Sequence, residues 1–279
     1  MDAIPFSHAP GALLRYENFP SRLIPPRHVD VWIPPNHEAS TDARFPVLYM
    51  HDGQNLFLPG NSFGSEPWAV DKAAVRLMAD GKIPGVIIVG VWNAGDSRWG
   101  EYLPQQPAET PEGRAFAARF PARLPGAIYS DSYLKFLVEE LKPFIDSIFR
   151  TLPDQPHTFV MGSSMGGLIS LYALTRYPQV FGGAGCISTH WVAGEALIVD
   201  YFGSVLPRPG FNKIYFDYGT ETLDAAYEPF QRRMDEHIRA AGYTFGKDWL
   251  TRKFEGAGHS EHSWRERVHI PLEFLLHIP

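Results

Sequence analysis

Short apolar runs alternate along this chain with longer segments in which apolar residues recur at helical spacing. The runs are rich in β-branched residues, which predicts strands at residues 27–33, 46–50, 86–92, 158–161, 184–187, 213–217 and 249–254. Helical spacing predicts helices at residues 66–78, 133–149, 165–177, 225–241 and 266–276, with Pro67 in the first turn of the first and Pro271 interrupting the last. Strands that alternate with helices favour an α/β fold, with a mostly parallel central sheet and helices on both faces.

Residues 93–128 are rich in Gly, Pro and Gln and lack a long periodic run, so we expect a long loop there. A loop of that length inside a compact domain is usually functional. The chain shows no repeat, low-complexity tract or linker, and α/β sheets often run past about 250 residues as one unit. We therefore expect residues 1–279 to form a single domain, with this loop near the active site.

The charge of the chain limits the classes of binding partner to expect. Lys and Arg total 25 and Asp and Glu total 31, so the formal net charge is −6, and the pI is about 6.0. Nucleic-acid-binding domains usually carry a basic patch and a high pI, so we expect no nucleic-acid partner. No apolar run approaches the roughly 18 residues of a membrane span, so we expect no membrane partner either.

The cysteine content and the first residues bear on the compartment. Cys186 is the single cysteine, which excludes an intrachain disulfide and a Cys-rich zinc site. The first residues show neither the basic region nor the apolar stretch of a signal peptide. We expect a cytoplasmic protein, although a chain without disulfides is also compatible with a periplasmic or secreted mature form.

The pattern Gly-x-Ser-x-Gly occurs twice, at residues 60–64 and 162–166. The second occurrence follows a predicted strand and opens a predicted helix, which is the setting of a nucleophile elbow, so Ser164 is the candidate nucleophile. The first occurrence has no immediate strand before it and is interpreted as a Gly-rich loop. A helix N-terminus beside the serine favours developing negative charge.

A serine hydroxyl needs a base, and in this setting the order along the chain is serine, acid, histidine. His259 lies in a small-residue loop directly after the last predicted strand, where a mobile backbone can present its imidazole to the carboxyl edge of the sheet. His262 is the second candidate. The two could instead form a zinc pair, but two ligands without a clear third make a poor site, so we expect no metal.

The acid should follow the predicted strand that ends at Asp217. Glu221 and Asp224 both lie there, and we favour Asp224, which could also serve as a helix N-cap. Acyl transfer also needs hydrogen-bond donors for the oxyanion. The backbone N–H groups of Met165, next to the nucleophile, and of Gln54, in the turn after the strand at 46–50, are the candidates.

Aromatic and polar residues near the predicted strand ends form a candidate substrate pocket. They are Trp92, Asn93, Arg98, His190 and Trp191. Aromatic rings there could stack on a sugar or a phenolic acyl group while Asn and Arg orient it. The alternative is that the tryptophans only pack the long loop.

Three segments together resemble a known family. Residues 49–57, 162–167 and 258–264 are similar to the esterase D-like "putative esterase" group of α/β-hydrolases, and the similarity extends from about Arg27 to the C-terminus. That group includes feruloyl and acetyl-xylan esterases, enterochelin esterases, S-formylglutathione hydrolases and mycolyltransferases. The resemblance implies a Ser–acid–His acyl-enzyme mechanism without metal or cofactor, with Ser164 as nucleophile and His259 as base. It implies an oxyanion donor at Gln54 and leaves Asp224 and Glu221 open, since the family varies at the acid. Some enterochelin esterase relatives work with a Ser–His pair alone.

The sequence therefore predicts a serine carboxylic-ester hydrolase acting on a polar or carbohydrate-linked ester, with a small molecule or an oligosaccharide as the substrate. Acyl transfer to a sugar, as in the mycolyltransferase relatives, is one alternative, and an S-formylglutathione hydrolase is less favoured. A non-catalytic carbohydrate-binding relative is the alternative from a different class, because fold does not imply function. The presence of Ser164, His259 and candidate acids in the right order speaks against it.

Overall fold

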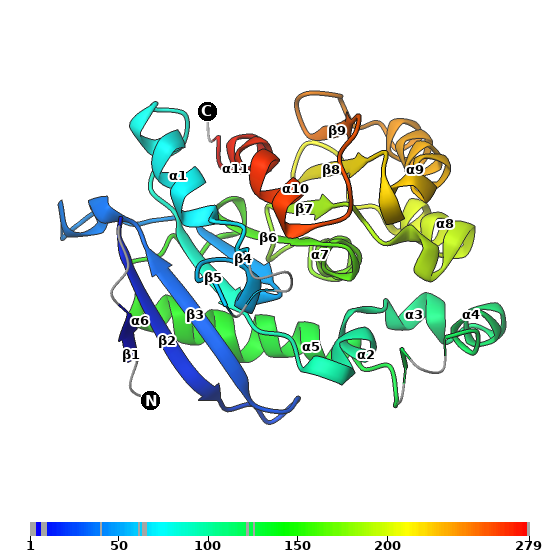
Figure 1. The fold of residues 1–279 in the computed structure, drawn as a ribbon, viewed down its shortest axis with the longest axis horizontal. Coiled ribbons are helices and arrows are strands. Elements are labelled where there is room, and N and C mark those ends of the chain that lie inside the picture. Colours follow the sequence, from blue (N-terminus) through cyan, green and yellow to red (C-terminus); the bar gives the residue numbers. More distant parts are fainter. Residues whose placement is uncertain are drawn as a thin grey trace.

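The computed structural model describes residues 4–6, 10–39, 41–60, 62, 66–120, 123–124 and 126–277. In this part of the chain the strands form one sheet in the order β1-β2-β3-β5-β4-β6-β7-β8-β9 (Figure 1). The strands are β1 (Ile4–Phe6), β2 (Ala12–Phe19), β3 (Arg27–Ile33), β4 (Val47–His51), β5 (Ile87–Val91), β6 (Thr158–Ser163), β7 (Gly183–Ile187), β8 (Lys213–Gly219) and β9 (Trp249–Phe254). The pairs among β1, β2, β3 and β5 are antiparallel, and the remaining pairs are parallel.

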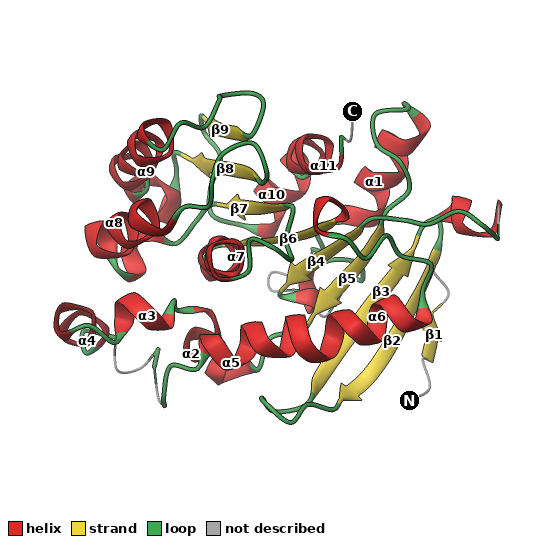
Figure 2. Ribbon diagram, turned by 180° about the vertical axis from the view of Figure 1, so that it is seen from behind, coloured by secondary structure: helices red, strands yellow, loops and turns green. Residues whose placement is uncertain are grey.

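Helices cover both faces of the sheet, which confirms the predicted α/β-hydrolase architecture. They are α1 (Val70–Ala79), α2 (Arg98–Tyr102), α3 (Gln105–Ala108), α4 (Pro111–Ala117), α5 (Ser130–Lys135), α6 (Lys142–Ile148), α7 (Met165–Arg176), α8 (Glu195–Val205), α9 (Glu228–Ala240), α10 (Glu261–Arg267) and α11 (His269–Leu276). A π-helical turn (Phe136–Leu141) joins α5 to α6. Figure 2 shows α5 and α6 on one side of the sheet and α1 and α11 on the other.

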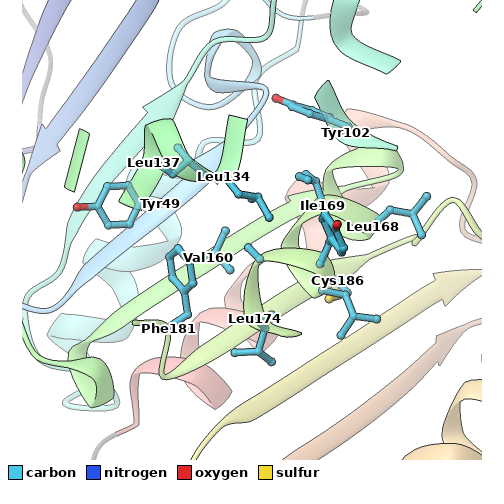
Figure 3. Close-up of a cluster of buried hydrophobic side chains, with 14 of the residues drawn as sticks. Tyr49, Tyr102, Leu134, Leu137, Val160, Leu168, Ile169, Leu174, Phe181 and Cys186 are labelled. Carbon is cyan, nitrogen blue, oxygen red and sulfur yellow. The ribbon is translucent and has the colours of Figure 1, made fainter. Parts of the chain in front are cut away.

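Alternating side chains of the strands divide the core into two layers. Val47 and Tyr49 of β4 belong to the cluster that contains α5, α6 and α7, whereas Leu48 and Met50 belong to the cluster that contains α1 and α11. Figure 3 shows part of the first cluster, which includes Leu168, Ile169 and Leu174 of α7 and Val160 of β6. The central strands are thus buried on both faces, which explains their continuously apolar sequences.

Every strand predicted from the sequence is present, with ends within about two residues of those expected. The structure adds β1, β2 and α8, which were not predicted. The segment expected to be a long loop, residues 93–128, instead contains the short helices α2, α3 and α4. Pro67 lies before α1 and not in its first turn.

The C-terminal region also differs from expectation, since two helices replace the single predicted helix. Pro271 does not interrupt a helix but lies in the first turn of α11. Proline is tolerated there because the first-turn N–H groups have no partner within the helix. The helix before it, α10, begins at Glu261 with Ser260 as its N-cap, directly after His259 in the chain, and carries Trp264 and Arg267.

Candidate active site

The candidate site lies at the carboxyl ends of the parallel strands, where loops of α/β sheets converge. A residue of the site lies in the segment that follows each of six neighbouring strands. These residues are Asp52 after β4, Asn93 after β5, Ser164 after β6, Ser188 after β7, Asp224 after β8 and His259 after β9. Residues far apart in the sequence are therefore neighbours at one edge of the sheet.

Ser164 occupies a strained turn between β6 and α7. Its φ is 59° and its ψ is −123°, a conformation that non-glycine residues rarely adopt. Its backbone is fixed on both sides: its N–H donates to Ile187 O (2.9 Å), and its carbonyl accepts from the N–H groups of Gly167 (3.0 Å) and His190 (3.1 Å). A Cβ at Gly162 would lie 2.9 Å from the backbone of Gly166, which explains the glycine two positions before the serine.

His259 and Asp224 form a short hydrogen-bonded pair. His259 Nδ1 lies 2.6 Å from Asp224 Oδ1, and the Asp224 side chain is fully buried. Asp224 lies in a 3-10 helix (Thr222–Ala226) that follows β8, and the Thr222 hydroxyl accepts the backbone N–H of His259 at 2.8 Å. The loop that carries the acid thereby also holds the backbone of the loop that carries the histidine.

The second oxygen of Asp224 is held by Ser188. The Ser188 hydroxyl donates to Asp224 Oδ2 (2.6 Å), and the N–H of Gly219 donates to the same oxygen (2.7 Å). The Ser188 oxygen in turn accepts from Trp264 Nε1 (2.9 Å) and Arg267 Nη2 (2.8 Å) of α10. Burial alone would raise the pKa of Asp224, but the hydrogen bonds from His259 and Ser188 outweigh it and lower that pKa, so the carboxylate is ionised.

Ser164 and His259 line one cavity of about 480 Å³. Its other lining residues include the oxyanion candidates Gln54 and Met165 and the predicted pocket residues Asn93, Arg98 and His190. Sequence reasoning missed several more, which are Asp52, Asn55, Trp99, Arg123, Ser163, Leu223, Glu261 and Trp264. Among these, Glu261 and Trp264 lie in the C-terminal segment that carries the family resemblance, so a signal for them was present in the sequence.

The turn that carries Gln54 is braced by Asp52. This residue has a left-handed backbone conformation (φ 55°, ψ 47°) and precedes a 3-10 turn (Gly53–Asn55). Its carboxylate accepts two hydrogen bonds of 2.7 Å from Arg98 and a third of 2.7 Å from Asn93 Nδ2. Burial opposes ionisation of Asp52, but Arg98 and Asn93 lower its pKa on balance. Arg98, expected to contact substrate, is thus mainly engaged by the protein.

Two predicted pocket residues do not line the cavity, and these expectations are corrected. Trp92 donates from Nε1 to Asp30 Oδ2 (3.0 Å) under the guanidinium of Arg15. Trp191 is 1% exposed and donates to Gln231 Oε1 (3.0 Å) within the core. Both indole rings are engaged by protein groups, and the hydrogen-bond partners Asp30 and Gln231 lie outside residues 93–128, so neither contact is the expected packing on the long loop.

The remaining candidates are placed away from the reacting groups. Glu221 has an exposed side chain, so the carboxylate that meets His259 is that of Asp224. His262 is exposed and hydrogen-bonds to Glu66 Oε2 (3.1 Å), whereas His259 hydrogen-bonds to Asp224, so His259 and His262 do not share a partner. Ser62, in the first Gly-x-Ser-x-Gly match, is not among the residues that line this cavity, and Asn61, Phe63 and Gly64 of that match lie outside the described residues.

The part of the chain that the structure describes contains no group of three or more His, Cys, Asp or Glu residues placed to hold a metal ion. Cys186 is buried, and burial raises the pKa of its thiol. No helix among the described residues is both long and apolar enough to span a membrane.

Comparison with known proteins identifies the family. Residues 21–268 match the family described as "Putative esterase". The chain is 25% identical over 263 residues to Bacillus subtilis (strain 168) YbbA, an uncharacterized protein, covering 89% of this chain and 92% of YbbA. It is 28% identical over 161 residues to the ferri-bacillibactin esterase BesA of the same organism, covering 53% of this chain and 50% of BesA.

A solved structure of a ferulic acid esterase has the same fold, with a TM-score of 0.68 at 19% identity over 95% of this chain and 97% of that one. The nucleophile elbow of this chain, the strand order around it and the family match over most of its length agree with one another. The chain therefore belongs to the "Putative esterase" family of α/β-hydrolases and is a serine esterase.

Proposed function

We propose that this protein hydrolyses a polar carboxylic ester through an acyl-enzyme formed on Ser164, with His259 as base and Asp224 as the residue that orients the base. The observation that carries the proposal is the 2.6 Å contact between His259 Nδ1 and Asp224 Oδ1, in the same cavity as the strained Ser164. A base held at Nδ1 presents Nε2 for proton transfer, which is the arrangement that serine hydrolases of unrelated folds share.

In the proposed mechanism the Ser164 hydroxyl attacks the ester carbonyl while His259 Nε2 takes its proton. The carbonyl oxygen becomes an oxyanion, which the N–H groups of Gln54 and Met165 stabilise at the N-terminus of α7. His259 then gives the proton to the departing alcohol, leaving Ser164 acylated. Water, activated by the same histidine, attacks the acyl-enzyme and releases the carboxylic acid and the free serine.

The cavity supports a polar substrate that also carries an aromatic or sugar ring. Trp99 and Trp264 contribute aromatic surface, and Arg123 lies over the Trp99 ring at 5.9 Å from its centroid. Aromatic rings beside a few polar groups are typical of sites for such molecules. BesA acts on a ferric siderophore by its name, and the structural neighbour acts on ferulic acid esters, so both ester classes belong in a first substrate panel.

Covalent labelling with a fluorophosphonate, followed by peptide mass mapping, tests the proposal. We expect one adduct, on Ser164, and none in Ser164→Ala. Ser62→Ala is the matched control, because Ser62 lies in the other Gly-x-Ser-x-Gly match and should leave labelling unchanged. Absence of any adduct would reject the esterase mechanism and favour a non-catalytic binding protein.

A panel of acetylated xylo-oligosaccharide, methyl ferulate and a catecholate siderophore ester then identifies the substrate class. Adding a free sugar to the same reactions separates hydrolysis from acyl transfer, because transfer yields an acylated sugar in place of the free acid. We expect the free acid as the product, since the proposed mechanism ends with water.

A further inference from the structure

A second histidine stands beside the base in the same cavity. His190 follows β7, lines the cavity and is 8% exposed, and its ring centroid lies 6.3 Å from that of His259. Its backbone N–H donates to the carbonyl of Ser164 (3.1 Å), so its position is tied to the nucleophile elbow itself. The mechanism above gives this imidazole no role.

The tautomer of His190 follows from its contact with Tyr227. His190 Nδ1 lies 2.7 Å from the Tyr227 hydroxyl, and Tyr227 is fully buried. Within the described residues this hydroxyl has no other hydrogen-bond partner, so its proton is satisfied only if it donates to Nδ1. A neutral imidazole that accepts at Nδ1 carries its proton on Nε2.

The charge state of His190 agrees with this assignment. Burial, together with the neighbouring His259 and Arg98, lowers the pKa of His190 to about 3, so the ring is neutral under ordinary conditions. Its Nε2 makes no hydrogen bond within the described part of the chain and is not among the polar atoms sealed from solvent. The ring therefore offers the cavity a single N–H donor of fixed direction.

His51 provides a contrast within the same molecule. Its Nδ1 also lies 2.7 Å from a tyrosine hydroxyl, that of Tyr133, but its Nε2 is sealed in the core without a partner, and it is not among the residues that line the cavity. A histidine–tyrosine pair is thus not by itself a sign of ligand binding here. What distinguishes His190 is that it lines the cavity that holds Ser164 and His259, and that its Nε2 is not sealed from solvent as that of His51 is.

We propose that His190 is a specificity-determining residue, whose Nε2–H donates a hydrogen bond to an oxygen of the substrate outside the scissile ester. The inference rests on the proposed function and adds a substrate class, namely esters that carry a hydroxyl, ether or carbonyl oxygen close to the scissile group. A neutral donor suits such uncharged oxygens, and an ester without one would leave the N–H unpaired in a partly desolvated site. Tyr227 acts through His190 as a positioning residue.

The kinetic test compares two esters in three proteins. The esters are the best substrate of the panel described above and phenyl acetate, whose two oxygens both belong to the scissile ester. In His190→Leu we expect kcat/KM for the panel ester to fall at least about tenfold, while kcat/KM for phenyl acetate stays within about threefold. His190→Gln keeps an N–H donor, so it should retain most of the wild-type kcat/KM for the panel ester.

Equal losses on both esters would overturn the proposal, because they would show that His190 serves the reaction or the fold in general. No loss on either ester would overturn it as well. Fluorophosphonate labelling of Ser164 in all three proteins separates this outcome from failure of the esterase mechanism, in which the wild-type protein itself would not be labelled.

A spectroscopic test addresses the tautomer directly. Nitrogen NMR of histidine-labelled protein should show His190 with a bare Nδ1 and a protonated Nε2, the signals being assigned by their loss in His190→Gln. In Tyr227→Phe we expect a mixture of tautomers and a smaller preference for the panel ester. Tyr133→Phe, the matched control, should alter His51 signals but leave that preference unchanged. A His190 protonated at Nδ1 in the wild-type protein would contradict the proposal.

Discussion

Ser188 gives its single hydroxyl proton to Asp224, at 2.6 Å, and its oxygen receives N–H groups from both Trp264 and Arg267. This one side chain therefore joins the proposed acid to α10. Removing the hydroxyl in Ser188→Ala takes a donor from a buried carboxylate and an acceptor from two buried donors. Alanine keeps the same Cβ, so the positive φ of this residue (42°) is not newly strained.

For Ser188→Ala we expect kcat to fall about ten- to hundredfold while KM stays within about twofold, because the orientation of His259 changes but the cavity does not. Steady-state kinetics on the best ester of the panel measures both constants. A rise in KM at unchanged kcat would show that the Ser188 network shapes the substrate pocket and does not orient the triad.

Asp224→Asn should lower kcat by about 10²–10⁴, because an amide can donate to Nδ1 and so favour the wrong tautomer of His259. Glu221→Gln is the control, since the Glu221 side chain is exposed, and it should change kcat less than about twofold. Similar losses of kcat in both variants would contradict the assignment of Asp224, and so would no loss in either.

Arg98→Lys should lower kcat at least about tenfold with little change in KM. Lysine cannot make the paired hydrogen bonds that Arg98 makes to Asp52, so the turn carrying Gln54 would lose its brace. Arg123→Ala gives the comparison, because Arg123 lines the same cavity and lies over Trp99, so its removal should raise KM instead. If Arg98→Lys also acted mainly on KM, Arg98 would be a substrate contact, as its sequence position suggested.

The free energy of unfolding should decrease as the pH falls from about 6.5 toward 3. Burial lowers the pKa values of His51 and His190 from 6.5 to about 3 in the folded protein. The unfolded chain therefore binds these two protons first, and acid favours unfolding, by about 1.4 kcal/mol per pH unit for each histidine within this range. Urea unfolding at several pH values measures the slope, which His190→Gln should reduce by one histidine's share. Identical slopes in the wild-type protein and in His190→Gln would contradict the expected contribution of His190.

The sequence predicted the parts of the site that depend on local chemistry. Ser164 became the candidate nucleophile because a strained elbow requires glycines at fixed spacing, and His259 became the candidate base because its loop follows a strand at the right place in the chain order. The central strands were predicted because burial on both faces leaves them continuously apolar.

Other features depend on contacts between distant segments, which no local pattern encodes. β2 was missed because Arg15 interrupts its apolar pattern, and the structure shows why this is tolerated: Arg15 pairs across the sheet with Asp30 at 2.7 Å. The orientation of the Trp92 and Trp191 rings likewise depends on residues distant in sequence, Asp30 and Gln231. Ser188 and Arg267 had no signal of their own, because each matters only through Asp224.

The link from Asp224 through Ser188 to α10 also bears on how the protein is made. The proposed nucleophile Ser164 and the proposed acid Asp224 are synthesised before Trp264 and Arg267, yet Ser188, which donates to Asp224, has all its partners only when these two residues have docked. A nascent chain that has not yet emerged beyond α10 would carry Ser164 and His259 without a completed triad. Activity would therefore appear only after α10 has been synthesised, and would report that this helix has docked on the sheet.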